Sequence, residues 1–199
     1  MQPAYYENFD EIIKKIWLML NDAVTNRSSQ FRIPVFICGI QNDFDGRIVV
    51  LRKSDQDNNL IQFHSDIRSD KIEKLKSNNR ASLIFYDKEE KIQVRAKVEC
   101  IVNHKNEVTE QSWLKTAHIS RKCYLVDNGP GTESVEPTSG LKPEKDNFDY
   151  TMEESEKGYE NFTVIQCKVK SFEWLYLAAK GHRRARFDLE NDKRVWLVP

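Results

Sequence analysis

Residues 91–100 alternate strictly between polar and apolar side chains, and this pattern constrains the fold more than any other feature of the sequence. The apolar positions are Ile92, Val94, Ala96, Val98 and Cys100. Successive side chains of a β-strand point to opposite faces, so this segment is predicted to be a strand with one dry face and one polar face. Such a strand needs partner strands and a core that covers its apolar face.

Other short extended runs surround this strand, and few helices separate them. We expect further strands over residues 33–40, 47–52, 60–64, 81–86, 162–176, 182–189 and 193–198. Helices are expected over residues 6–24, 69–76 and 106–117. Many short strands with few helices between them favour a closed antiparallel barrel over a parallel sheet connected by helices.

Charge balance and hydrophobicity exclude several classes of protein. In 199 residues, 31 lysines and arginines balance 31 aspartates and glutamates, whereas a general nucleic-acid binder needs a surplus of cations. No run approaches the roughly 18 apolar residues that cross a bilayer, and the first charged residues are acidic, unlike those of a secretory signal. The four cysteines form no C-x-x-C pair, so we expect no metal site. These features predict an intracellular protein, cytoplasmic with the nucleus as an open alternative, without membrane or nucleic-acid partners.

Residues 127–161 differ in composition from the rest of the chain. Glycine, proline, serine, threonine and acidic residues dominate this segment. Such a composition is typical of loops rather than of a packed core. We therefore interpret 127–161 as a mobile inserted loop within one domain that spans residues 1–199.

Two clusters of cations stand beside expected strand ends. Arg47 and Arg52 bracket the apolar run between them, where packing requires neither charge. Arg68, Ser69 and Lys71 follow a strand and open a helix, whose free backbone N–H groups and partial positive charge attract phosphates. Both clusters also have a plainer interpretation, as the solvated ends of a half-buried strand and as an ordinary capped helix.

A third cationic run, Lys-Gly-His-Arg-Arg-Ala-Arg-Phe, covers residues 180–187. A basic localisation signal or a nucleic-acid patch has a similar composition. The alternation of its cations with Phe187 and Leu189 favours a strand instead, because residues two apart share a face.

Taken in order, these motifs resemble the pyridoxamine 5′-phosphate oxidase-like family. The matching features are Arg-x-Val-x-Leu-Arg at 47–52, His-x-x-x-Arg-Ser-x-Lys at 64–71, Gln-Val-Arg at 93–95, and Trp174 eight residues before His182. The resemblance spans residues 33–199 and is strongest to the branch with Arg-Ser-x-Lys and His-Arg-Arg motifs. It implies a mainly β fold with flanking helices, a six-stranded antiparallel split β-barrel that forms a homodimer and binds FMN between its subunits.

The resemblance also implies which residues bind the cofactor. The set is Arg47, Val49, Val50, Leu51, Arg52, Phe63, His64, Arg68, Ser69, Lys71, Gln93, Trp174 and Arg184. Trp174 and Arg184 would reach the flavin ring from the other subunit, where an arginine stabilises negative charge on the reduced ring. The assignment depends on one expectation, that the cations at 47, 68 and 71 converge on a single phosphate dianion.

The sequence departs from the oxidases of the family where the substrate would bind. The Ser-Arg-Pro-Arg-x-Ser-Gln-like segment that grips the substrate phosphate is missing from residues 113–122, and Arg52 stands where a lysine is expected. His182 alone remains of an Arg-x-His pair and is the candidate catalytic residue, with a structural hydrogen bond as its alternative role. The substrate stays unassigned.

Three functional hypotheses follow. The first is an FMN-dependent oxidoreductase similar to pyridoxamine 5′-phosphate oxidase, acting on a small molecule. The second is a non-catalytic FMN-binding protein, a sensor or sequestering module, which the missing substrate motif favours. The third is a binder of haem or deazaflavin on the same barrel, although the phosphate-binding motif argues against haem.

Overall fold

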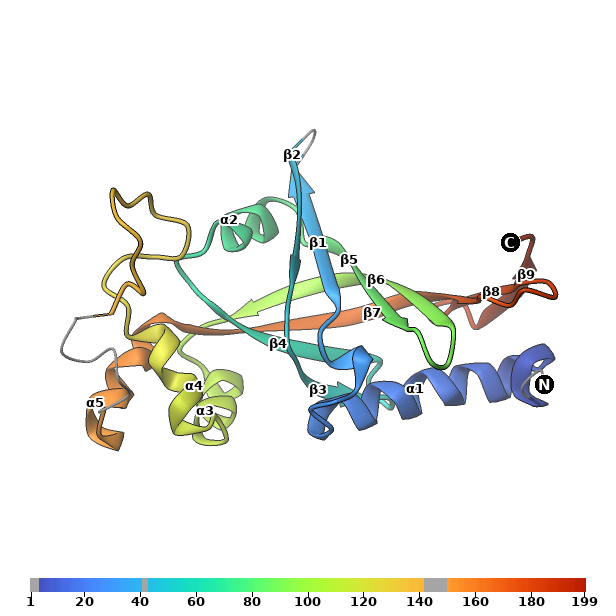
Figure 1. The fold of residues 1–199 in the computed structure, drawn as a ribbon, viewed down its shortest axis with the longest axis horizontal. Helices are drawn as coiled ribbons and strands as arrows, with labels where there is room; N and C mark the ends of the chain where they lie inside the picture. Colours follow the sequence, from blue (N-terminus) through green and yellow to red (C-terminus); the bar gives the residue numbers. More distant parts are fainter. Residues whose placement is uncertain (1–3, 41–42, 142–149) are drawn as a thin grey trace.

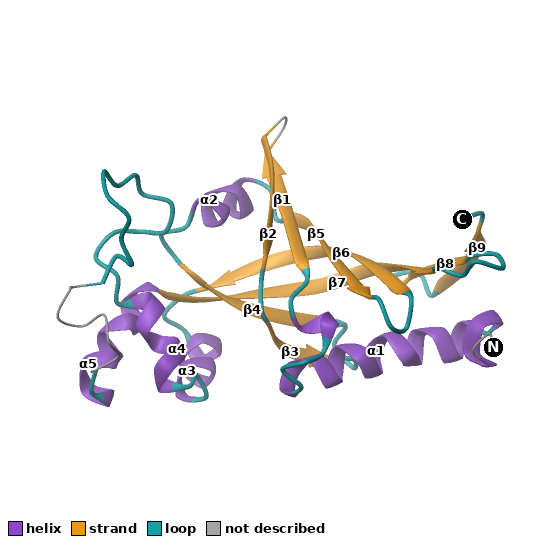
Figure 2. Ribbon diagram, viewed as in Figure 1, coloured by secondary structure: helices purple, strands orange, loops and turns teal. Residues whose placement is uncertain are grey.

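One antiparallel sheet forms the centre of the computed structural model, which describes residues 4–40, 43–141 and 150–199 (Figures 1 and 2). The described residues form nine strands; seven pair in the order β2-β1-β5-β6-β7-β4-β3, β8 pairs with β7, and β9 pairs with β8. Their bounds are β1 Val35–Ile40, β2 Asp43–Ile48, β3 Leu51–Asp55, β4 Leu60–Asp66, β5 Arg80–Asp87, β6 Ile92–Asn103, β7 Phe162–Tyr176, β8 Arg183–Asp188 and β9 Lys193–Leu197. The mainly β antiparallel fold class is confirmed, whereas the expected count of six strands is not.

The expected strand 47–52 is divided into two strands that pair with different neighbours. β2 pairs with β1, and β3 pairs with β4. Between them the backbone N–H of Val49 donates to the carbonyl of Pro34 at 3.1 Å. β2 and β3 stand at the two ends of the main strand order, yet only residues 49 and 50 separate them along the chain. The sheet must therefore curl until its ends meet, which makes it a barrel.

The barrel encloses an aromatic and aliphatic core, and helix α1 (Phe9–Thr25) covers one side of it (Figure 1). Ile12, Ile16 and Leu20 recur on one face of α1 and are fully buried, as the sequence periodicity predicts. Asn8 begins the helix by accepting a hydrogen bond from the backbone N–H of Asp10 at 2.9 Å. The core also contains three of the four cysteines, Cys38, Cys100 and Cys167.

Helices α3 (Glu107–Leu114), α4 (His118–Arg121) and α5 (Met152–Glu156) gather at the end of the barrel opposite the two termini (Figure 1). Helix α2 (Asp70–Ser77) lies apart from them and contacts β1. α5 lies inside the expected loop 127–161, whose residues 142–149 are outside the described residues. Thr151 and Glu154 form a capping box that begins α5. No helix in the described parts of the chain is long and apolar enough to span a bilayer.

Candidate functional site

The end of β4 and the start of α2 bring Ser65, Ser69 and Lys71 together. The Lys71 ammonium donates to both serine hydroxyls at 2.9 Å and forms no ion pair with a carboxylate of the described residues. Burial, helped by the nearby charge of Arg47, lowers the pKa of Lys71. Ser69 precedes α2, but its hydroxyl donates to the carbonyl of Asp66 at 2.8 Å instead of capping the helix. A buried cation with neutral partners at a helix start is suited to an anion.

Arg47 reaches the same helix from β2. Its guanidinium forms a two-pronged ion pair with Asp70, with Nη1–Oδ1 at 2.8 Å and Nη2–Oδ2 at 3.2 Å, and it also contacts Asp45. The Nε of Arg47 is buried and has no hydrogen-bond partner in the described parts of the chain. Buried polar atoms without a partner are rare in proteins, so the guanidinium of Arg47 is not fully satisfied by its two aspartates. Arg47 and Lys71 therefore converge at the start of α2.

Arg68 does not join them. Its Nε and Nη2 donate to the carboxylate of Asp66 at 3.0 and 2.8 Å, and its Nη1 donates to the carbonyls of Val126 and Asp127, both at 3.1 Å. Arg47 and Lys71 thus stand together at the start of α2, whereas the Arg68 guanidinium is bound by Asp66; a phosphate shared by the cations at 47, 68 and 71 stays a prediction. The reason is local, because Asp66 lies two residues before Arg68 and binds it. Arg68 ties the inserted segment to the start of α2.

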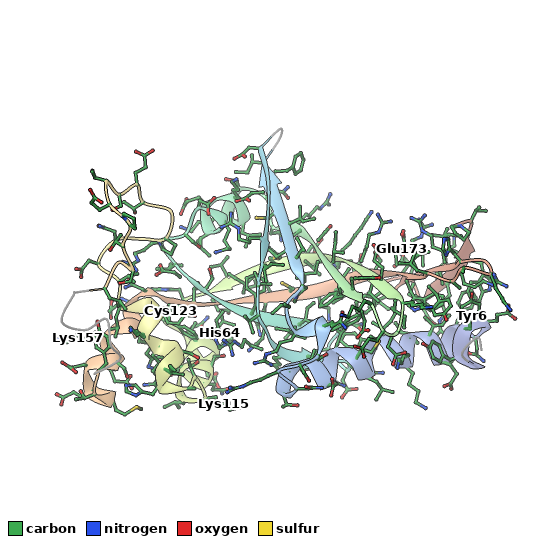
Figure 3. The ribbon with its side chains drawn as sticks, viewed as in Figure 1. Tyr6, His64, Lys115, Cys123, Lys157 and Glu173 are labelled. Atoms are coloured by element: carbon green, nitrogen blue, oxygen red, sulfur yellow. The ribbon has the colours of Figure 1, made fainter. Side chains whose placement is uncertain are left out.

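Arg52 and His64 line a separate cavity of about 570 Å³ between β3, β4 and helices α3 and α4. Arg27, Lys53 and Lys115 also line it, and no aspartate or glutamate does so in the described residues. Figure 3 labels His64 and Lys115, which lie on the side of the barrel that carries helices α3 and α4. The Nε of Arg52 is buried without a partner among the described residues. Burial, together with the charge of Arg52, lowers the pKa of His64 to about 3. The imidazole is therefore neutral, and the cavity favours anions.

Gln93 and Arg184 lie in one row on the outer face of the sheet, since Gln93 pairs with Leu175 and Leu175 pairs with Arg184. Arg184 donates through Nε and Nη2 to Glu173 Oε1 at 2.9 and 2.6 Å, and Arg95 contacts the same oxygen. Burial acts to raise the pKa of Glu173, but hydrogen bonds from the two arginines outweigh it and hold the pKa below its ordinary value. Glu173 thus fixes the direction in which Arg184 points.

Trp174 is placed differently from the expectation. Its side chain is fully buried and packs edge-to-face on Tyr6 at 6.1 Å. Trp174 pairs with Ala185, one residue from Arg184, so the two side chains lie on opposite faces of the sheet. Within this chain, the Trp174 side chain does not reach the face that carries Gln93 and Arg184.

Other residues expected to bind the cofactor have side chains that are buried in the hydrophobic core. The buried side chains are those of Val49, Leu51 and Phe63. Only the backbone of these residues is available to a ligand, and Val50 is half-buried. β4 pairs with β3 only up to Phe63, so from His64 onward one edge of β4 is free of that partner.

His182 makes the structural hydrogen bond that was the alternative to a catalytic role. Its Nδ1 accepts from the backbone N–H of Ala178 at 3.0 Å. The sequence argument named none of the carboxylates that pair with the expected cations, namely Asp45, Asp66, Asp70 and Glu173. Asp70 could have been noticed from the sequence, because it occupies the variable position of the Arg-Ser-x-Lys motif. The pairing of Glu173 with Arg184 could not, because it depends on the register between β7 and β8.

Residues 17–104 match the family model of the pyridoxamine 5′-phosphate oxidase FMN-binding domain. The resemblance to the pyridoxamine 5′-phosphate oxidase-like family is confirmed. The match includes Arg47, Arg52, His64 and Lys71, and it ends before β7. No protein of curated function matches the sequence.

Solved structures of the split-barrel fold align with the whole chain. A pyridoxamine 5′-phosphate oxidase-related, FMN-binding protein from Nostoc punctiforme covers 100% of both chains, with 15% identity and a TM-score of 0.68. PhzG from Burkholderia lata, solved with tetrahydrophenazine-1-carboxylic acid, covers 100% of this chain and 98% of its own, with 14% identity and a TM-score of 0.71. At such low identity, these alignments show the fold alone.

Proposed function

We propose that the chain binds FMN and acts as an FMN-dependent oxidoreductase of the pyridoxamine 5′-phosphate oxidase-like kind. The observation that carries this proposal is the buried ammonium of Lys71, which donates to two hydroxyls and to no carboxylate of the described residues, beside the guanidinium of Arg47. These two cations at the start of α2 are suited to the phosphate of FMN. Each charge-assisted hydrogen bond contributes about 1.5–3 kcal/mol. Three or four of them support roughly micromolar binding after the cost of immobilising the ligand.

We infer that a second copy of the chain completes the site around the flavin ring. His64 lies at the α3–α4 end of the molecule, whereas Glu173, which holds Arg184, lies toward the β8–β9 end (Figure 3). A ligand of flavin size cannot touch both ends of one chain, but a symmetric dimer brings the two regions together. The outer face of the sheet carries exposed apolar side chains suited to such contact, at Phe44 (72% exposed), Ile48 (58%) and Tyr86 (47%).

The cationic cavity beside Arg52 supports turnover of a small anionic substrate. Bound flavin supplies hydride transfer, and the chain binds and orients the reactant. Arg52 and Lys115 provide the positive charge, and neutral His64 provides a hydrogen-bonding group that burial keeps uncharged. The alternative is a non-catalytic FMN-binding protein. The absence of the substrate-phosphate motif from residues 113–122 favours it.

Two measurements test this proposal. The purified chain is denatured, and the released cofactor is weighed by mass spectrometry; the expected species is FMN, at about one per chain, and a colourless protein that takes up no added FMN rules the function out. The loaded protein is then assayed for peroxide formation from pyridoxamine 5′-phosphate and oxygen. Turnover would exclude the non-catalytic alternative.

A further inference from the structure

The carboxylate of Asp70 forms an ion pair with Arg47, the residue that the proposed function assigns to the phosphate of FMN. We propose that Asp70 competes with the phosphate for Arg47 and thereby sets how strongly the chain prefers FMN over a flavin that lacks phosphate. This inference rests on the proposed function and adds a residue that controls the specificity of the same site.

The geometry of the Arg47–Asp70 pair is that of a phosphate contact. Two parallel bonds join the guanidinium to the carboxylate, Nη1–Oδ1 at 2.8 Å and Nη2–Oδ2 at 3.2 Å. Arginine presents the same fork to carboxylates and to phosphates. Asp70 Oδ1 also accepts from the backbone N–H of Lys71 at 2.8 Å, a donor in the first turn of α2. Asp70 therefore occupies two of the donors that a bound phosphate would use.

Positive and negative side chains are equal in number around Arg47 and Lys71. Arg47 and Lys71 are balanced by Asp45 and Asp70, both of which contact Arg47. An arriving dianion thus meets no surplus of positive charge while Asp70 stays in place. The hydrogen bond from Arg47 lowers the pKa of Asp70, which keeps the carboxylate ionised. A phosphate must displace this charge, whereas a neutral ribityl hydroxyl gains little by doing so.

Asp70 is free to move aside, in contrast to the carboxylate that holds Arg68. The side chain of Asp70 is 57% exposed, whereas that of Asp66 is 5% exposed. An exposed ion pair is weak, so a dianion with more oxygens displaces it at small cost. Lys74, on the next turn of α2, pairs with Asp43 at 2.9 Å and has its Nζ 4.0 Å from Asp70, so its ammonium can also pair with the displaced carboxylate as a second partner.

The test compares FMN with riboflavin, which has the same ring and ribityl chain but no phosphate. Dissociation constants are measured by flavin fluorescence on the full-length apoprotein and on its Asp70→Asn and Glu73→Gln variants. Glu73 is the matched control, because it is an acidic residue in the same first turn and pairs with Lys76. We expect Asp70→Asn to bind FMN about three- to tenfold more tightly, with riboflavin binding unchanged and with no effect of Glu73→Gln.

Asp70→Ala serves as a second variant, since it removes the carboxylate without adding an amide donor, and it must also tighten FMN binding. Unchanged or weaker FMN binding by the Asp70 variants, or equal tightening of FMN and riboflavin, would overturn the inference while leaving the proposed function intact. A wild-type protein that binds no FMN would overturn both.

Discussion

Trp174 and Arg184 lie on opposite faces of the sheet, although they stand on neighbouring strands. Trp174 pairs with Ala185, and Leu175 pairs with Arg184, so alternation along β7 and β8 sends the two side chains apart. Trp174 packs under Tyr6 in the core, and Arg184 is held by Glu173 on the outer face. Trp174 therefore contributes to the core, and Arg184 is the residue of the two that the proposed function places beside the flavin ring.

The first prediction concerns Trp174→Phe. The indole Nε1 is buried without a partner among the described residues, so the substitution removes packing but no hydrogen bond. We expect a loss of about 1–2 kcal/mol in the free energy of unfolding, measured in urea, with FMN affinity unchanged. Arg184→Gln should show the reverse pattern, with weaker FMN binding and little change in stability. A large loss of FMN affinity in a well-folded Trp174→Phe variant would disprove this division.

The second prediction concerns the pH dependence of stability. The pKa of His64 is about 3 in the folded protein, against an ordinary value of 6.5. Above the ordinary value both states are neutral and the group has no effect. As the pH falls from 6.5 towards 3, His64 takes up a proton in the unfolded chain but not in the folded chain. The free energy of unfolding therefore falls by up to about 1.4 kcal/mol per pH unit.

Urea unfolding at several pH values between 7 and 4 measures this slope. His64→Gln cannot titrate and should flatten it, whereas His118→Gln, which leaves His64 in place, should retain it. An identical slope in wild type and His64→Gln would show that other groups cause the acid sensitivity.

The third prediction concerns Glu173→Gln. The variant removes the negative charge that neutralises Arg184 and Arg95, so the potential at the outer face becomes more positive. If Arg184 faces the flavin ring, the reduction potential of bound FMN should rise, because positive charge favours the reduced ring. Potentiometry against a reference dye measures the shift. Glu99→Gln is the control, since Glu99 pairs with Lys170 elsewhere on the sheet. A potential unchanged by Glu173→Gln would place Arg184 away from the ring.

Periodicity along the chain predicted the individual strands of the sheet but not how they pair. The alternation of residues 91–100 gave β6 its two faces, and the bounds 162–176 of β7 were predicted correctly. The break between β2 and β3 could not be predicted, because residues 48–51 are uniformly apolar and only pairing with β1 and β4 separates the two strands. α5 was missed although its capping box was legible in the sequence, because the surrounding composition indicated a loop.

The candidate site was predicted in part for the same reason. The Arg-Ser-x-Lys motif placed Lys71 at a helix start, where the structure has it. The motif could not show that Asp66 would bind Arg68 or that Trp174 would face the core. Those outcomes depend on a turn and on strand register, which spacing along the chain does not reveal.

The fourth prediction concerns Lys71→Met in the absence of ligand. Burial lowers the pKa of Lys71, so the charged amine opposes folding, and this cost is relieved only as the pH rises toward the ordinary value of 10.5. Replacing a buried cation by an apolar side chain of similar length should leave the free energy of unfolding unchanged or raise it. A folded and stable variant makes its ligand affinity interpretable.

Titration of the apoprotein with FMN, comparing wild type with Lys71→Met, tests the central claim most directly. The control is Lys76→Met, because Lys76 is an exposed lysine of the same helix. The account predicts roughly micromolar or tighter binding by the wild type and by Lys76→Met, and binding at least about tenfold weaker by Lys71→Met. Equal affinity of all three proteins for FMN would contradict a phosphate site at Lys71.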